Sequence, residues 1–243
     1  MSLKSLCLGA AALAVVFGAP PAFAQPTQNV ILVHGALVDG SGWRGVYERL
    51  VAKGLKVTVV QEPNTSLADD VQAVHRAIEQ QNGPVVLVGH SYGGQIITEA
   101  GVDPKVSALV YVAAIVPDVG EGVGDVFEKW PSPTADAFKP TSDGFLLFDP
   151  AKFRAGFAAD LSKAETDFMT NSQVPVSAKI LGTKTQHAAW KTKRATASWP
   201  GWTWLSAPRR SGLCTSGQVR RSPRCPVPAM RFTSRIRAKS PMS

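Results

Sequence analysis

No aspartate or glutamate follows Asp167 in this chain of 243 residues. Residues 1–191 carry 15 Lys and Arg side chains against 18 acidic ones, whereas residues 192–243 carry 11 Lys and Arg and no acid. The formal net charge of +8 therefore arises from the C-terminal segment. A basic arm of this kind is typical of proteins that bind nucleic acid or an anionic surface. No recognisable binding motif accompanies it, so we expect no nucleic-acid partner.

Cysteines, long apolar runs and metal-ligand motifs are also scarce. Cys7 lies near the N-terminus, and the other two cysteines, Cys214 and Cys225, either pair or stay free. A disulfide-rich scaffold is therefore excluded. No cluster has the spacing of metal ligands, and we expect neither a metal nor an organic cofactor. The apolar stretch at residues 6–17 is too short to span a bilayer comfortably.

That stretch lies in an N-terminal segment with the features of an export signal. Lys4 provides a positive start, and Ala22-Phe23-Ala24 is a small-residue cleavage site. We predict a signal peptide over residues 1–24, removed before Gln25. The mature protein would then be periplasmic or secreted, with no membrane attachment. The alternative is an N-terminal membrane anchor.

The chain after the leader alternates between two kinds of segment. Residues 29–33, 55–60, 85–88 and 106–115 are short apolar runs rich in Val, Leu and Ile. Segments with helical spacing separate them, and Ser66 with an acid three residues later marks one helix start. This alternation predicts an α/β fold, a doubly wound parallel sheet with helices on both faces.

The pattern changes after Pro117 and again at Arg194. Residues 118–191 contain short helical segments, loops with Pro and Gly, and no obvious strand, as expected for a helical lid. From Arg194 on, Arg, Ser and Pro dominate. We predict a core over residues 25–193 that includes the lid. We predict an atypical basic tail over residues 194–243 that is disordered, so that the last strands and helices are missing.

The most informative motif is Gly89-His90-Ser91-Tyr92-Gly93, which has the pattern G-x-S-x-G. An apolar run precedes it, and a segment able to form a helix follows it. Between a strand and a helix this pattern indicates a nucleophile elbow. The small residues permit a sharp turn that presents the serine hydroxyl above the sheet. The alternative is an ordinary turn between strand and helix.

Two further segments match the same family as this motif. The first predicted strand ends in His34-Gly35-Ala36 and leads to Asp39-Gly40-Ser41-Gly42-Trp43, and the fourth leads to Pro117-Asp118. Together with the elbow they resemble the α/β-hydrolase family. The nearest branch is that of small secreted bacterial hydrolases, which are similar to plant esterases and hydroxynitrile lyases. The resemblance covers about residues 27–193.

This resemblance implies a role for each matched position. Ser91 would be the nucleophile, and the backbone N–H groups of Ala36 and Tyr92 would hold the oxyanion of the tetrahedral intermediate. His34 would order the loop after the first strand rather than act as the base. We expect no catalytic role for His90.

The base and the acid that such a serine needs are not in their expected places. In this family the chain order is Ser, then Asp or Glu, then His near the C-terminus. Here no acid follows Asp167, and the last histidine, His187, lies in the predicted lid. One alternative is an improvised triad in which Ser91 uses His187 and Asp118.

Codon arithmetic offers an explanation for the unusual tail. When reading starts at the third base of each codon, Trp199-Pro200 must encode Ala and Trp202-Thr203 must encode Asp, because Trp has a single codon. The third bases of most neighbouring codons are not fixed by the protein sequence. With suitable choices, residues 198–210 can encode the family's strand with its acid in this frame, and residues 228–243 can encode its histidine segment. We therefore infer a frame shift near Lys193.

The sequence thus predicts a serine hydrolase that acts on a carboxylic ester or a similar small acyl substrate, impaired by the loss of its acid and histidine. Without the last strands, the strand at 106–115 would be an uncovered edge prone to aggregation. Hydroxynitrile lyase chemistry would reuse the same residues. The alternative from another class is a non-catalytic exported pseudo-hydrolase or small-ligand-binding protein. The sequence indicates no oligomeric state.

Overall fold

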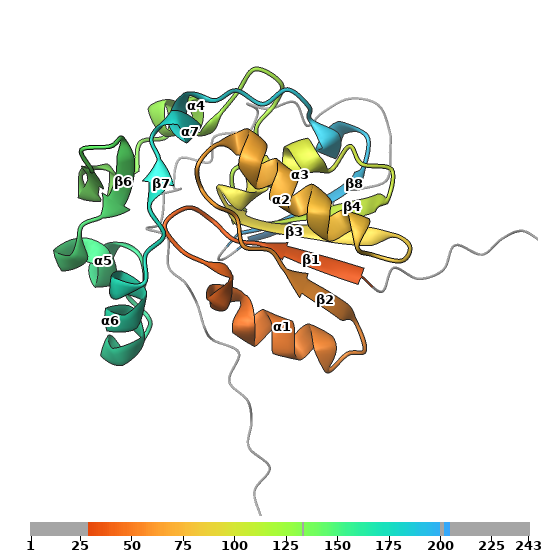
Figure 1. Cartoon of the computed structure of the whole chain (residues 1–243), viewed down its shortest axis with the longest axis horizontal. Coiled ribbons are helices and arrows are strands. Elements are labelled where there is room, and N and C mark those ends of the chain that lie inside the picture. Colours follow the sequence, from red (N-terminus) through yellow and green to blue (C-terminus); the bar gives the residue numbers. More distant parts are fainter. Residues whose placement is uncertain (1–28, 133, 200–201, 205–243) are drawn as a thin grey trace, which may run out of the picture.

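The computed structural model describes residues 29–132, 134–199 and 202–204 (Figure 1). Several predictions fall on segments outside these residues. They are the signal peptide at 1–24, the cysteines Cys214 and Cys225, and the tail beyond residue 204.

A six-stranded sheet forms the centre of the fold, in the order β2-β1-β3-β4-β8-β9. The first five strands in that order are parallel, and β9 is antiparallel to β8. The four predicted strands are confirmed, because each apolar run is a strand of the parallel sheet. The strands are β1 Asn29–Val33, β2 Lys56–Val59, β3 Val85–Ser91, β4 Val106–Ala114, β8 Arg194–Trp199 and β9 Trp202–Trp204.

Helices lie on both faces of this sheet, as predicted. Helix α1, Arg44–Val51, follows a 3-10 turn and covers one face, while α2, Leu67–Glu79, and α3, Gly93–Ala100, cover the other (Figure 1). The hydroxyl of Ser66 accepts a hydrogen bond from the backbone N–H of Asp69 at 3.1 Å, which confirms the predicted helix start.

The strand order determines where a ligand can bind. β1 lies between β2 and β3. The chain therefore moves to one side of β1 to form β2 and then to the other side to form β3. Such a reversal opens a crevice beyond the carboxyl ends of the strands. The loop after β1 and the elbow after β3 both leave the sheet at this point.

The lid contains strands as well as helices, so the prediction of a lid without strands is wrong. Three short strands form an antiparallel sheet in the order β5-β6-β7. Residues 145–148, Phe-Leu-Leu-Phe, are uniformly apolar and too short to show a period. Gly144, at φ +87°, ends the preceding turn. The lid elements are α4 Val123–Lys129, β5 Phe138–Pro140, β6 Phe145–Phe148, α5 Pro150–Gly156, α6 Lys163–Asn171, β7 Val176–Ser177 and α7 Lys179–Gly182.

The predicted boundary between core and tail at Arg194 is wrong, because the central sheet continues past it. Strand β8 pairs in parallel with β4 from Arg194 to Ser198, so β4 is not an uncovered edge and the sheet continues past Arg194. Ala195 and Ala197 pack against the core. This strand is hard to predict because Ala, Thr and Ser give it little apolar contrast.

Candidate active site

Ser91 lies at the end of β3, in a strained backbone conformation. Its φ is +52°, in the left-handed region that a non-glycine residue seldom adopts. Helix α3 begins two residues later, at Gly93. The strand, sharp turn and helix predicted from the motif are therefore all present. The backbone strain at this serine is the local signature of a nucleophile elbow.

Glycines make this turn sterically feasible. A Cβ atom on Gly93 would lie 2.4 Å from the carbonyl oxygen of His34, and one on Gly89 would lie 2.5 Å from the carbonyl oxygen of Gly93. Both neighbours are backbone atoms, which cannot rotate away. The glycines of the motif thus allow α3 to start against the ends of β1 and β3.

The segment His34–Val38 follows β1, and we call it the oxyanion loop. It passes directly beside Ser91, since a Cβ atom on Gly35 would lie 2.9 Å from that of Ser91. Ala36, Ser91 and Tyr92 line one cavity. The structure therefore brings together all three residues that the family resemblance selected. Tyr92 also precedes the N-terminus of α3, where free N–H groups and the helix dipole favour negative charge.

The cavity over Ser91 has a volume of about 70 Å³ and is roofed by the lid. None of the described residues that line it carries a carboxylate, an ammonium group or an imidazole. Its polar side chains are hydroxyls, and the rest are apolar. The residues in question are Ala36, Leu37, Ser91, Tyr92, Ile115, Val123, Phe127, Ser132, Thr134, Phe138, Leu146, Phe148, Gly156, Phe157, Val176, Ser177, Ile180 and Leu181.

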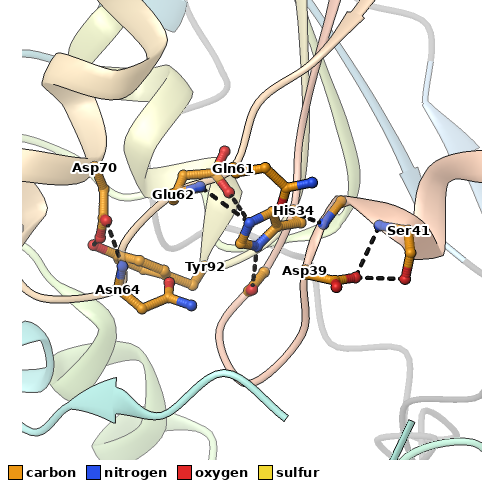
Figure 2. Close-up of polar contacts among 10 residues, drawn as sticks. His34, Asp39, Ser41, Gln61, Glu62, Asn64, Asp70 and Tyr92 are labelled. Carbon is orange, nitrogen blue, oxygen red and sulfur yellow. Dashed lines mark hydrogen bonds and ion pairs between the residues drawn. The ribbon is translucent and has the colours of Figure 1, made fainter. Parts of the chain in front are cut away.

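Two buried polar pairs involve the oxyanion loop and the elbow (Figure 2). In the first, Nε2 of His34 lies 2.5 Å from a carboxylate oxygen of Glu62 and accepts a hydrogen bond from the Glu62 backbone N–H at 3.1 Å. Burial opposes the charge on His34, but the contact with Glu62 outweighs it and raises the pKa of His34. Burial also raises the pKa of Glu62, against the pull of His34.

The second pair joins the elbow to α2. The hydroxyl of Tyr92 donates to Asp70 at 2.7 Å, and the backbone N–H of Asn64 donates to the same carboxylate at 2.8 Å. Burial raises the pKa of Asp70, and burial together with Asp70 raises the pKa of Tyr92. The carbonyl of Asn64 accepts from the N–H of Ser177, which ties this network to the lid.

The sequence did not point to Glu62 or Asp70. Their contacts with His34 and Tyr92 span 28 and 22 residues. One signal was available, because Glu62 follows β2 at the carboxyl edge of the sheet, where functional side chains gather in α/β folds.

His90, which flanks Ser91, is buried and does not line the cavity. Its ring lies edge-on to Trp43, with 6.3 Å between the centroids. Burial lowers its pKa to about 4. These features agree with the expectation that His90 is not catalytic.

This lowered pKa predicts an acid sensitivity of the fold. The unfolded chain protonates His90 near pH 6.5, whereas the folded chain resists protonation down to about pH 4. Folding stability should therefore fall by roughly 3 kcal/mol as the pH drops through this window. Urea unfolding of the unmodified chain and of His90→Gln at pH 7 and pH 4 measures the effect. The variant should lose less stability than the unmodified chain. An equal loss in both would contradict the assignment.

His187 and Asp118 are not brought together. Nδ1 of His187 lies 2.9 Å from Glu99, near the far end of α3, whereas Asp118 pairs with Lys191 at 2.5 Å. Six residues of helix, a rise of about 9 Å, separate Glu99 from Gly93. Neither His187 nor Asp118 lines the cavity. The arrangement thus gives no support to the improvised triad.

In the described part of the chain, no helix is long and apolar enough to cross a membrane. Within the same residues, no three His, Cys, Asp or Glu side chains gather as a metal site would require.

Comparisons with known proteins find chains of similar sequence and fold. The carbendazim hydrolyzing esterase of Nocardioides sp. is 32% identical over 123 residues, which are 45% of this chain and 51% of that protein. Methylesterase 7 of Arabidopsis thaliana is 29% identical over 174 residues, 62% and 66% of the two chains. A pyrethroid hydrolase from Sphingobium faniae has a similar fold, with a TM-score of 0.57 at 23% identity over 69% of this chain and 76% of that one.

A family model supplies the broadest match. The model described as "Alpha/beta hydrolase family" matches residues 30–230, which include the elbow, the oxyanion loop and the lid. The chain belongs to the alpha/beta hydrolase family.

Proposed function

We propose that this chain is built as a serine ester hydrolase with Ser91 as its nucleophile. The observation that carries the proposal is the cavity shared by Ser91, Ala36 and Tyr92. The strained φ of Ser91 and its place between β3 and α3 support the same role.

The residues would act as follows. The Ser91 hydroxyl oxygen attacks the ester carbonyl carbon, and the carbonyl electron pair moves to oxygen. The N–H groups of Ala36 and Tyr92 donate hydrogen bonds to this oxyanion, each contributing about 3–4 kcal/mol. The carbonyl re-forms as the bond to the alcohol oxygen breaks, and the departing alkoxide takes a proton from solvent. Water then hydrolyses the acyl ester on Ser91, which releases the carboxylic acid and restores the hydroxyl. Without a base, the proton of Ser91 must pass to solvent.

The cavity lining favours an uncharged, apolar ester. Aromatic and aliphatic side chains from the lid surround Ser91, and the lining offers no group to pair with an ionised substrate. Relatives that carry the names carbendazim hydrolyzing esterase and methylesterase support ester chemistry of this kind.

The same lining supports impaired catalysis. A serine hydroxyl needs an adjacent base, yet no described lining residue is a histidine or a carboxylate. His187 is held by Glu99 instead. A frame shift near Lys193 would account for the missing acid and histidine. A non-catalytic role as a small-ligand-binding protein is the second candidate. The absence of a catalytic base among the described lining residues of the cavity favours it. On the basis of the N-terminal features of the sequence, we also propose that the protein is exported from the cytoplasm.

Labelling with a fluorophosphonate tests the role of Ser91. In this reaction the serine oxygen bonds to phosphorus, fluoride leaves, and the proton goes to solvent. We expect slow modification of one site, mapped to Ser91 by mass spectrometry and absent in Ser91→Ala. His187→Ala should be labelled at the unmodified rate. Equal labelling of Ser91→Ala would overturn the proposal, and slower labelling of His187→Ala would restore the improvised triad.

A further inference from the structure

In the oxyanion loop, the imidazole of His34 holds the peptide group between Gly35 and Ala36 through a hydrogen bond. Nδ1 of His34 lies 2.9 Å from the carbonyl oxygen of Gly35. A carbonyl only accepts hydrogen bonds, so Nδ1 must carry the hydrogen. The C=O and N–H groups of a trans peptide point in opposite directions, and the described chain has no cis peptide bond. The anchored Gly35 carbonyl therefore turns the Ala36 N–H away from His34.

The other side of the ring faces Glu62. Nε2 of His34 lies 2.5 Å from the carboxylate, and both side chains are almost completely buried, at 3% and 0% exposure (Figure 2). Among the described residues, neither carboxylate oxygen has a hydrogen-bond partner besides this contact with His34. A buried carboxyl group is costly unless it is paired. Glu62 and the His34 ring thus fix each other's position.

We propose that Glu62 is a positioning residue, which acts through the His34 ring to aim the Ala36 amide at the oxyanion. This inference rests on the proposed function of the oxyanion loop. It assigns a task to a buried carboxyl group that does not touch the cavity.

The hydrogen bonds of the His34 ring assign the protons of this pair. Nε2 accepts the Glu62 backbone N–H at 3.1 Å, so the ring hydrogen lies on Nδ1, which bonds to Gly35. The proton in the contact between Nε2 and the side chain of Glu62 then belongs to the carboxyl group, whose pKa burial raises. When this proton leaves as the pH rises through that raised value, the carboxylate competes for the ring hydrogen and the Gly35 anchor weakens.

Other charged groups act on the pair. Asp39 favours the charged form of His34 and Asp70 disfavours that of Glu62, while His90 and Tyr92 interact with His34 and Glu62 respectively. Among these groups, only Glu62 has a carboxylate in contact with Nε2 of His34. Asp39, whose side chain bonds Ser41 at 2.9 Å, is therefore a suitable control.

Two variants separate positioning from mere packing. Glu62→Leu leaves Nε2 without its carboxyl partner, whereas Glu62→Gln keeps a donor to Nε2 but cannot titrate. NMR of the His34 ring nitrogens and the Ala36 amide across pH 6–10 reads the geometry directly, without requiring activity. The rate of fluorophosphonate labelling at Ser91 reads its consequence.

We expect Glu62→Leu to shift the Ala36 amide signal and to slow labelling by about 10- to 100-fold, as part of one oxyanion contact is lost. Glu62→Gln should keep Nδ1 protonated at the alkaline pH where the unmodified chain loses it. Asp39→Asn should still lose it, because the contact between Glu62 and Nε2 stays intact. The Gln comparison remains decisive if the Leu variant fails to fold.

An Ala36 signal that is the same in the unmodified chain and both Glu62 variants at every pH would overturn the proposal. If the Ala36 signal responds as expected but Ser91 is never labelled in any chain, the positioning role stands and the proposed hydrolase function fails.

Discussion

Gly93→Ala is expected to lower the free energy of unfolding by at least about 3 kcal/mol, or to prevent folding altogether. The new Cβ atom would lie 2.4 Å from the carbonyl oxygen of His34 and 2.8 Å from that of Val33. Both oxygens belong to the backbone where β1 leaves the central sheet, so only a displacement of α3 or β1 relieves the clash. Domains of this kind are stable by roughly 5–15 kcal/mol, so this loss is severe.

Urea unfolding followed by circular dichroism measures the effect. Gly42→Ala is the matched control, because nothing lies within 4 Å of the atom it adds. That variant should stay within about 0.5 kcal/mol of the unmodified chain. If both variants unfold at the same urea concentration, the close approach of the elbow to β1 is wrong.

Restoring the alternative reading frame from Lys193 onward is expected to raise ester hydrolysis by roughly four to six orders of magnitude. The restored chain would regain an acid, which the codons of Trp202 and Thr203 require. It would also regain a late histidine if the codon that spans Ala229 and Met230, which must end in AT, begins with C. Losing the triad histidine costs about this much in serine hydrolases studied by mutation. The increase should appear in kcat, because base and acid act on the reacting atoms.

The matched control is the restored chain with Ser91→Ala, which should lose the gain completely. Replacing the restored Asp by Asn should remove most of it. If the restored chain is no faster than the present one, the frame-shift explanation fails.

The sequence predicted the four strands that are rich in Val, Leu and Ile and alternate with helices, and it missed β8 and the strands of the lid. Residues 29–33 and 106–115 could be identified because parallel strands buried on both faces are rich in Val, Ile and Leu. Strand β8, Arg-Ala-Thr-Ala-Ser-Trp, contains no Val, Leu or Ile and owes its place to pairing with β4. The lid strands have two to four residues each, too few for any period to show.

The residues of the site likewise differ in whether the sequence could predict them. Ser91 could be proposed as the nucleophile because a nucleophile elbow has a local motif, and the proposed roles of Ala36 and Tyr92 followed from the family resemblance. Glu62 and Asp70 form their contacts across 28 and 22 residues, and no local pattern encodes such pairs.

We propose that Ser91 has both oxyanion donors but, among the described residues, neither a base nor an acid beside it. The turnover of p-nitrophenyl acetate by the unmodified chain, Ser91→Ala and His187→Ala tests this proposal most directly. We predict a rate barely above that of buffer, with the small excess lost in Ser91→Ala and kept in His187→Ala. Rapid turnover that both substitutions abolish would contradict the claim.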